Sequence, residues 1–389
     1  MRILIVLTYY RPHTSGLTIY AERLAKALVK RGHQVTVLTS RYLKELPSEE
    51  IQDGVRIVRA PVLFRLSKGV IMPTFGFIAN RLVLENDVIH LHLPQFDAAG
   101  IALRGRLLKK PTVITYHCDL LMPPGVMAWA ANQGVHIMNS LAAIFTHRIV
   151  YYTLDYAEHS PFIRNHIQKM HVIPPPVELP VIPRDYILSF EKENNPNHQR
   201  PVIGIAARFA TEKGIEVLLK AMPAVLNVFP NALVQFAGPY HNIIGEEEYF
   251  ERLKPLIEKY EKEEHWRFVG TLKPEKMAAF FPNLDVLVLP SLNSTESFGL
   301  VQIEAMINGV PSVASDLPGV RQPVLMHGMG KIIPIGDSTA LAQAILAILA
   351  DPQAYRKEAE PIALRYQPDR IASDYEMLFS EIQNQLQGQ

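Results

Sequence analysis

The stretch 284–309 constrains the fold of this chain more than any other. Five of its first six residues, 284–289, are valine or leucine, which is typical of a strand buried in a parallel sheet. A polar loop follows, and then a helical segment from about Phe298 to Ile307, which Asn308-Gly309 ends. Ligands bind open α/β sheets at the carboxyl ends of their strands, so this unit predicts a site at such an edge.

Two carboxylates, Glu296 and Glu304, flank the start of this helix with seven residues between them. Glu296 precedes the helix and can reach a ligand at its mouth, whereas Glu304 lies on the helix flank and can accept paired hydroxyls. The backbone N–H groups of Phe298, Gly299 and Leu300 are first-turn donors, which attract phosphate or sugar oxygens. On this pattern alone, two solvated glutamates near a helix start are the alternative.

Length and composition indicate a globular protein of two domains. The chain has 389 residues, of which 48% are hydrophobic and 20% charged. The single cysteine, Cys118, excludes an internal disulfide framework and a cysteine-based zinc site. The apolar N-terminal run is shorter than a signal-peptide core, and no apolar stretch reaches about 18 residues. We therefore expect a cytoplasmic protein.

Charge is distributed unevenly along the chain. Residues 1–180 contain 20 Lys and Arg against 12 Asp and Glu, a net charge of +8, and the remainder carries −7. This bias favours an anionic partner of the N-terminal half, such as an acidic membrane surface at the inner face of the cell membrane. A dipolar two-domain protein without a membrane role is the alternative, and no nucleic-acid partner is expected.

The first 40 residues predict a β-α-β unit, the start of a doubly wound sheet. A nicotinamide-dependent dehydrogenase would carry G-x-G-x-x-G after the first strand, but the loop 8–16 contains a single glycine. That glycine, Gly16, opens a helix and could offer its N–H to a phosphate; a simple helix cap is the alternative.

Histidines lie at the ends of two later strands. His90 and His92 share one face of a strand, where packing is a better interpretation than metal ligation. His117 follows another strand at its carboxyl end and is better placed to contact substrate, with a structural role as the alternative. The strands predicted in this half after the first unit are 55–58, 88–91, 112–116, 149–153 and 171–173.

A change in amino-acid composition divides the chain. Many prolines and then a polar run precede residue 201, so 181–200 is interpreted as a linker between domains at 1–180 and 201–370. A final amphipathic helix within 371–389 is expected to pack back on the first domain. Both halves alternate strands and helices, which predicts two Rossmann-like doubly wound domains and an active site in the cleft between them.

Two cations follow the first strand of the second domain. Arg208 and Lys213 span a turn that leads into a helix near Gly214, and together they form a clamp suited to a diphosphate. Taken singly, each would be interpreted as a solvated surface charge. Leu272 closes another strand on the same edge, where main-chain groups could pair with a flat heterocycle.

With these motifs in place, the chain resembles the retaining glycosyltransferases of family 4, which have the GT-B fold of two facing α/β domains. The resemblance covers nearly the whole chain. It rests mainly on T-E-S-F-G-L-V-Q-I-E-A-M-I-N-G-V-P and A-A-R-F-A-T-E-K-G, with support from R-G-H-Q-V-T-V-L-T, D-V-I-H-L-H-L-P, T-Y-H-C-D-L and L-P-G-V-R. Many members have two glycines in the first loop, where this chain has Ser15-Gly16.

The resemblance implies roles for individual residues. Arg208 and Lys213 would bind the donor diphosphate and stabilise it as a leaving group. Glu304 would hold the ribose hydroxyls, and Glu296 the hydroxyls of the transferred sugar. The main chain of Leu272 would bind the base, and backbone groups of Phe298, Gly299 and Leu300 would bind the sugar. Gly16 would lie against the diphosphate, and His117 would lie near the reacting carbon.

The resemblance also implies a reaction without cofactor or metal. The chain has no D-x-D sequence, the usual grip on a metal–diphosphate complex. Positive side chains can stabilise the leaving diphosphate directly, while the acceptor attacks from the same face. Closure of the domains would exclude water.

The substrates stay open at this level. A UDP- or GDP-activated hexose and a sugar or lipid-linked acceptor are expected, in polysaccharide, lipopolysaccharide or glycolipid synthesis. The segments 65–77 and 120–143 could face a lipid-linked acceptor or form buried helices. A nucleotide-sugar epimerase of the same fold and a non-catalytic nucleotide-sugar-binding protein are the alternative functions.

Overall fold

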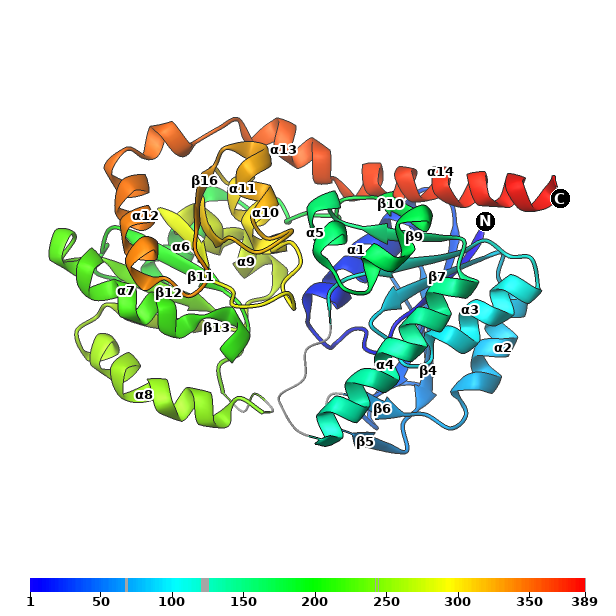
Figure 1. Ribbon diagram of the computed structural model, residues 1–389. Coiled ribbons are helices and arrows are strands. Elements are labelled where there is room, and N and C mark those ends of the chain that lie inside the picture. Colours follow the sequence, from blue (N-terminus) through cyan, green and yellow to red (C-terminus); the bar gives the residue numbers. More distant parts are fainter. Residues whose placement is uncertain (67–68, 120–125, 242, 244, 389) are drawn as a thin grey trace. The chain divides into compact units, whose positions relative to one another are not determined.

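The computed structural model divides the chain into two compact units (Figure 1). Unit 1 comprises Met1–Val177 and Tyr366–Gln389, and unit 2 comprises Glu178–Arg365. The structure describes residues 1–66, 69–119, 126–241, 243 and 245–388; the side chains of residues 66 and 126–131 are also outside the description. Among the described residues, no helix is both long and apolar enough to cross a membrane.

Unit 1 is built on an eight-stranded sheet in the order β10-β9-β8-β7-β1-β2-β4-β3. All neighbouring strands are parallel except β3, which runs antiparallel to β4 at one edge. The central strands are buried on both faces, because helices cover both. The strands are β1 (Arg2–Val6), β2 (Gln34–Arg41), β3 (Glu49–Gln52), β4 (Val55–Pro61), β7 (Val88–Leu93), β8 (Thr112–Tyr116), β9 (Arg148–Tyr151) and β10 (Met170–Val172), with a separate hairpin of β5 (Phe64–Leu66) and β6 (Gly69–Ile71).

The helices of unit 1 connect these strands. Helices α2, α3 and α4 pack against one another in that order, and α1 packs against the C-terminal helix α14 (Figure 1). The bounds are α1 (Gly16–Lys30), α2 (Phe75–Glu85), α3 (Ala98–Leu107), α4 (Val126–Phe145), α5 (Leu154–His159) and α14 (Pro368–Gln387), with a 3-10 segment, η1 (Ile163–Lys169).

The C-terminal helix is held to unit 1 by polar contacts in its first half and by apolar contacts along its length. Arg31, at the end of α1, forms ion pairs with Asp369 at 3.0 Å and Glu376 at 2.7 Å. Tyr375 and Phe379 are fully buried and contact the ring of His90 in β7. A segment almost 200 residues away in sequence from the rest of unit 1 thus completes its core.

Unit 2 contains a six-stranded, wholly parallel sheet in the order β13-β12-β11-β14-β15-β16. Its strands are β11 (Val202–Ala206), β12 (Leu233–Ala237), β13 (Trp266–Gly270), β14 (Val286–Leu289), β15 (Ser312–Ser315) and β16 (Gly330–Ile333). Its helices are α6 (Arg184–Asn194), α7 (Ile215–Val228), α8 (Glu247–Lys262), α9 (Pro274–Phe280), α10 (Leu300–Met306), α11 (Gln322–His327), α12 (Ser338–Ala350) and α13 (Ala359–Tyr366, whose last residue belongs to unit 1), with short 3-10 turns η2 (Thr211–Lys213), η3 (Phe281–Asn283) and η4 (Pro352–Tyr355).

The structure differs from the sequence analysis in the segment 181–200. Helix α6 occupies most of this segment and packs against α9, so a stretch with the composition of a linker is part of unit 2. Few of its side chains are buried, chiefly Phe190 and Asn194. Because so little of α6 faces the core, its sequence shows only weakly the periodic spacing of apolar residues that indicates a helix.

Candidate active site at the strand ends of unit 2

The two segments singled out by their motifs lie side by side. Strands β11 and β14 are hydrogen-bonded neighbours at the centre of the sheet, so the loops that follow them emerge at the same edge. A backbone hydrogen bond from Leu292 N to Glu212 O, 2.9 Å long, ties one loop to the other. The cations of the first loop are thereby brought to the glutamates of the second.

Gly214 allows this close approach. It lies between η2 and α7 with φ +67°, a left-handed conformation that favours glycine. A Cβ atom there would lie 2.0 Å from the carbonyl oxygen of Pro290, so no side chain fits without moving one of the loops. The glycine therefore fixes the spacing between the loops after β11 and β14.

We expect Gly214→Ala to lower the free energy of unfolding by about 3 kcal/mol, combining the left-handed conformation with a steric clash. Gly309→Ala is the matched control, because Gly309 has φ +73° but no atom within 4 Å of its would-be Cβ. It should lose only about 1 kcal/mol. Urea unfolding midpoints measure both; equal losses would show that the approach of the two loops is not tight.

Lys213 and Glu296 form the centre of the site. The Nζ atom of Lys213 lies 2.7 Å from Oε2 of Glu296, and both side chains are largely buried. The other carboxylate oxygen, Oε1, accepts a hydrogen bond of 2.9 Å from the backbone N–H of Gly299. Glu296 thus bridges the loop after β11 and the start of α10, which holds an ammonium group and a carboxylate in fixed positions at the sheet edge.

Arg208 lies on the same loop as Lys213 and is more exposed. Its NH2 group pairs with Glu212 Oε1 at 2.5 Å, within one turn of chain. Burial alone would raise the pKa of Glu212, but a backbone hydrogen bond and the charges of Arg208 and Lys213 outweigh it and lower that pKa. Glu212 therefore stays ionised and orients the guanidinium group of Arg208, whose side chain remains 39% exposed to solvent.

Helix α10 begins later than the sequence suggested. Its first residue is Leu300, and Gly299 forms its N-cap with φ +78°, so the N–H of Phe298 precedes the helix. The N–H of Gly299 already bonds to Glu296. The prediction of three first-turn donors from Phe298 to Leu300 is therefore wrong in detail, because the left-handed glycine delays the helix.

The interior of α10 holds the loop that precedes it. Gln302 is fully buried, and its Nε2 donates to the carbonyl oxygens of Phe298 and Val320 at 3.1 and 2.8 Å. Its Oε1 accepts a hydrogen bond from Ser312 Oγ at 2.9 Å. Glu304, two residues along, is also largely buried. The side-chain amide of Gln302 thus holds the loop between β14 and α10 in place.

Leu272 follows β13, two strands away from β11 along the sheet. It lies at the same edge and packs against the apolar cluster around Phe280 and Leu284. Gly270, just before it, has φ +74°, which turns the chain toward α9. Leu272 thus lies near the end of β13 and contributes apolar packing there.

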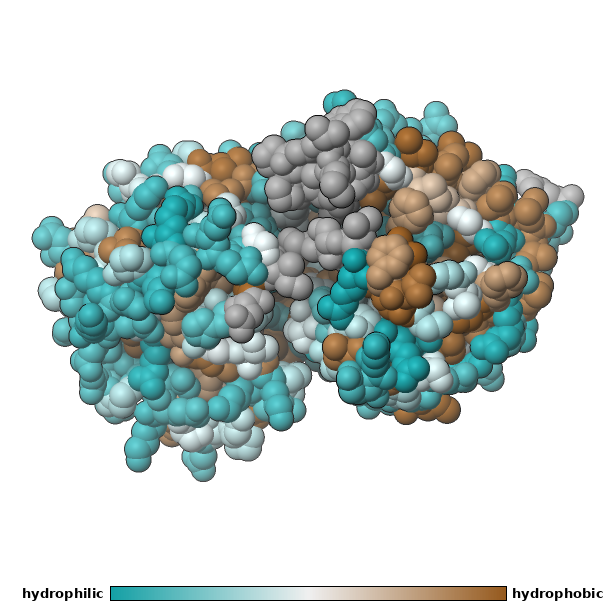
Figure 2. Space-filling view, turned by 90° about the horizontal axis from the view of Figure 1, so that it is seen from below, coloured by the Kyte–Doolittle hydropathy of each residue, from teal (hydrophilic) through white to brown (hydrophobic). Residues whose placement is uncertain are grey.

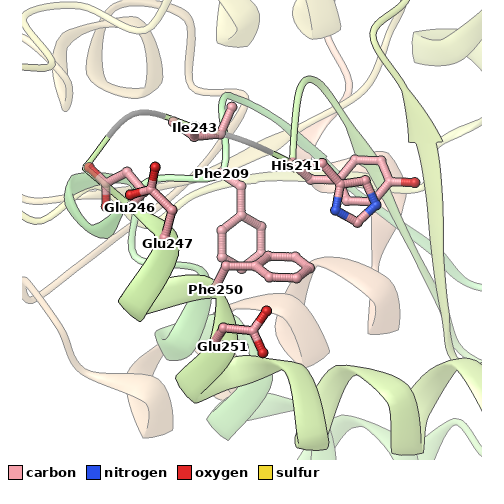
Figure 3. Close-up of a pocket in the computed structure, with 8 residues that line it drawn as sticks. Phe209, His241, Ile243, Glu246, Glu247, Phe250 and Glu251 are labelled. Atoms are coloured by element: carbon pink, nitrogen blue, oxygen red, sulfur yellow. The ribbon is translucent and has the colours of Figure 1, made fainter.

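A separate pocket of about 120 Å³ lies beside the loop that carries Arg208. Figure 3 shows aromatic and acidic side chains around it, among them Phe209, Phe250, His241 and Glu246. Glu246 accepts hydrogen bonds from the N–H and hydroxyl of Thr211 at 2.9 and 2.7 Å. This pocket contains none of the predicted site residues, and we interpret its Glu246 as a support for the η2 turn.

The two predicted residues of unit 1 lie at the carboxyl edge of its sheet. Gly16 is the first residue of α1, after the Ser15 side chain that accepts from Thr18 N at 3.2 Å. His117 directly follows β8 and is 5% exposed. Strands β1 and β8 flank β7, so both residues stand at one edge of one sheet.

His117 is held at both ring nitrogens. Its Nε2 lies 2.8 Å from Nδ1 of His92, and its Nδ1 is hydrogen-bonded to the hydroxyl of Tyr152. Burial and the neighbouring His92 lower the pKa of His117, so its ring is neutral. Among the described residues, no group of three or more histidines, cysteines and carboxylates could hold a metal ion.

Two family models match the chain. "Glycosyltransferase Family 4" matches residues 14–184, and "Glycosyl transferases group 1" matches residues 188–363, so together they span both units. The chain belongs to the family 4 glycosyltransferases.

Relatives include a phosphatidyl-myo-inositol mannosyltransferase of Mycobacterium leprae, 26% identical over 90% of this chain and 87% of its own. They also include a glycogen synthase of Mycobacterium tuberculosis, 26% identical over 97% of this chain and 91% of its own.

Solved structures of glycosyltransferases share the GT-B fold of this chain. Sucrose-phosphate synthase from Thermosynechococcus elongatus has a TM-score of 0.74 at 22% identity, covering 98% of both chains. HepE of Anabaena, in complex with UDP-glucose, has a TM-score of 0.72 at 20% identity over the full length of both. The expected fold class, two Rossmann-like α/β domains, is confirmed.

Some residues that contact the predicted site residues escaped the sequence analysis. Glu212 lies four residues after Arg208, and that spacing could have indicated the pair. Gln302 and Tyr152 gave no such signal, because their partners come from distant segments. The structure joins Lys213, Glu296 and Gly299 by hydrogen bonds and keeps Arg208 on the same loop.

Proposed function

We propose that this glycosyltransferase moves a hexosyl group from a nucleoside-diphosphate sugar to a sugar or lipid-linked acceptor, with retention of the anomeric configuration. The observation that carries the proposal is the bridge Lys213–Glu296–Gly299, which puts a cation and a carboxylate at adjacent strand ends. A cation suits the donor diphosphate and a carboxylate suits sugar hydroxyls. Relatives described as GDP-mannose-dependent and a neighbour solved with UDP-glucose support a donor of this class.

The diphosphate binds Arg208 and Lys213 in this proposal. Arg208 offers a planar fork to the phosphate oxygens, and Lys213 adds a point charge from the deeper position. The pairing of Lys213 with Glu296 keeps the ammonium group in place before the donor arrives. Glu304, on the flank of α10, holds the ribose hydroxyls, and the main chain at Leu272 meets the base.

The transfer step needs no metal in this proposal. The bond between the anomeric carbon and the diphosphate oxygen breaks, and Arg208 and Lys213 stabilise the negative charge on the leaving group. The acceptor oxygen bonds to the anomeric carbon from the same face, and its proton passes to the departing diphosphate. His117 and Gly16, at the sheet edge of unit 1, contact the sugar and the diphosphate. A neutral His117 suits a hydrogen bond to a sugar hydroxyl.

A thermal-shift panel of UDP, GDP, ADP and their hexose conjugates, in the presence of EDTA, tests the donor site. A ligand that binds only the folded protein at about 100 times its Kd adds about 2.7 kcal/mol of stability. We expect one nucleotide to stand out and to lose its effect in Arg208→Ala and Glu304→Ala. Lys220→Ala, on the exposed side of α7, should keep it. No shift with any nucleotide would contradict the proposal.

We also propose that unit 1 contacts an anionic membrane surface, where a lipid-linked acceptor would be available. The excess of basic residues in the first 180 residues supports this contact. A membrane contact brings the enzyme to its acceptor without altering the chemistry of the donor site.

A further inference from the structure

Three helices of unit 1 form an unusual layer on one side of its sheet. Helices α2, α3 and α4 pack in that order, and their outward side chains together make a surface that we call the outer face. Its exposed hydrophobic residues are Phe77 and Leu84 of α2, Leu103, Leu107 and Leu108 at α3, and Ile137, Leu141 and Ile144 of α4. Three neighbouring helices therefore each expose apolar side chains on the same layer.

The exposure of these side chains is large. Phe77 is 81% exposed, Leu107 73% and Ile137 56%. Figure 2 shows hydrophobic residues gathered over unit 1, whereas unit 2 is mostly hydrophilic in the same view. Scattered single hydrophobic residues are ordinary on protein surfaces, but such a gathering marks an interaction site.

Helix α4 is the clearest case. Over its 20 residues, Val126–Phe145, it contains no Asp, Glu, Lys or Arg. Ile137, Leu141 and Ile144 follow a spacing of four and three residues, so they form one exposed stripe. A surface helix ordinarily presents charged residues to water, so this stripe fits an apolar partner.

Basic residues accompany the apolar ones. Within α2, α3, α4 and the turn that ends α3, the chain has Arg81, Arg104, Arg106, Lys109 and Lys110, against a single acidic residue, Glu85. Glu85 is already paired with Arg56 at 3.0 Å. In the part of the chain that the structure describes, neither Arg106 nor Lys109 has an ion-pair partner. The outer face is therefore both apolar and positively charged.

Lysines also brace the ends of two of these helices. Lys110 Nζ donates to carbonyl oxygens of Val83 and Leu84 at the end of α2, at 2.6 and 3.0 Å. Lys169 Nζ donates to those of Ala143 and Ile144 at the end of α4, at 2.8 and 2.7 Å. The C-terminal ends of α2 and α4 are thus fixed, and the apolar stripe of α4 lies next to such an end.

We infer that the outer face docks onto an anionic lipid bilayer, with apolar side chains entering the interface and basic side chains contacting lipid phosphates. The combination matches an interfacial surface, in which buried apolar area and attraction to anionic lipids act together. A second copy of the chain is the less favourable occupant, because a symmetric pairing would bring the same positive charges together.

This inference deepens the proposed membrane contact and rests on it, but it needs neither donor nor acceptor. The test is therefore vesicle cosedimentation of the full chain without nucleotide. Vesicles of phosphatidylcholine with phosphatidylglycerol should bind the protein, and phosphatidylcholine alone should bind it far less. Raising the salt concentration should weaken binding, since screening acts on the charged part of the attraction.

Two variants separate the charged from the apolar contribution. Each basic residue near an anionic surface contributes about fivefold to binding, so Arg106→Glu with Lys109→Glu should weaken it by at least about 20-fold. Phe77→Asp with Leu107→Asp should weaken it by at least about tenfold. The controls are Lys262→Glu and Leu364→Asp, exposed residues of unit 2 that should leave binding unchanged.

Nucleotide-induced thermal stabilisation, measured on the same variants, separates the two proposals. Binding to vesicles without any thermal stabilisation by nucleotide would contradict the proposed donor site but not the proposed docking surface. The inference is overturned if the chain ignores anionic vesicles, or if the outer-face variants bind as well as the controls. It is also overturned if light scattering finds a dimer that Phe77→Asp with Leu107→Asp turns into a monomer, since the face would then join two copies.

Discussion

Replacing Lys213 with alanine is expected to lower kcat for sugar transfer by about 10²–10³-fold. On the proposed function, its ammonium group stabilises the charge that develops on the leaving diphosphate, and removing one such preorganised donor has an effect of this size. Arg208→Ala should lower kcat to a similar extent. The double variant should lose less than the product of the two effects, because both cations act on one group. Release of nucleoside diphosphate measures each rate.

The control for this experiment is Lys220→Ala, which removes an exposed cation from α7 without touching the loops after β11 and β14. Its kcat should match the wild type. Lys213→Ala leaves the carboxylate of Glu296 bonded to the N–H of Gly299, so the loop should stay folded. An unchanged kcat in Lys213→Ala and Arg208→Ala would mean that the diphosphate binds elsewhere.

Unit 1 is expected to lose stability steeply as the pH falls from about 6.5 toward 5. Burial lowers the pKa of His92 to about 3, and burial together with neighbouring histidines lowers the pKa values of His90 and His117. In the unfolded chain each histidine has a pKa of about 6.5. Below that pH the unfolded state binds more protons, so acid favours unfolding, while above it the stability is fully present.

Each buried histidine contributes a slope of at most about 1.4 kcal/mol per pH unit, so the three together approach about 4 kcal/mol per unit. Urea unfolding at pH 7.0, 6.0 and 5.5 measures this slope. His90→Phe is the variant to compare, because His90 packs among the rings of Tyr375 and Phe379 and its loss removes one titrating group. A stability independent of pH over this range would show that the histidines are solvated.

Much of the architecture could be predicted from local pattern. Strand β8 has the predicted bounds, Thr112–Tyr116. Strand β14, Val286–Leu289, begins two residues after the start of the predicted apolar run and ends with it. Helix α7 begins at Ile215 as expected, because Gly214 has a left-handed backbone conformation and forms the N-cap. By contrast, β16 is a short strand with a lysine in its middle, and its pattern gave no prediction.

The site was harder to predict than the fold, for a physical reason. A motif identifies residue types, but Lys213 and Glu296 are 83 residues apart and meet only because β11 and β14 are neighbours. The start of α10 depends on the backbone conformation of Gly299, which its residue type permits but does not require. The partners of His117 come from β7 and the segment after β9, so no local spacing could have indicated them.

The anomeric configuration of the product tests the central claim most directly. The protein, its best nucleotide hexose from the thermal-shift panel and a candidate acceptor are incubated with EDTA, and the product is analysed by NMR of its anomeric proton. The account predicts acceptor-dependent release of nucleoside diphosphate and a product with the same anomeric configuration as the donor. An inverted product, or a reaction that stops in EDTA and resumes with a divalent metal, would contradict it.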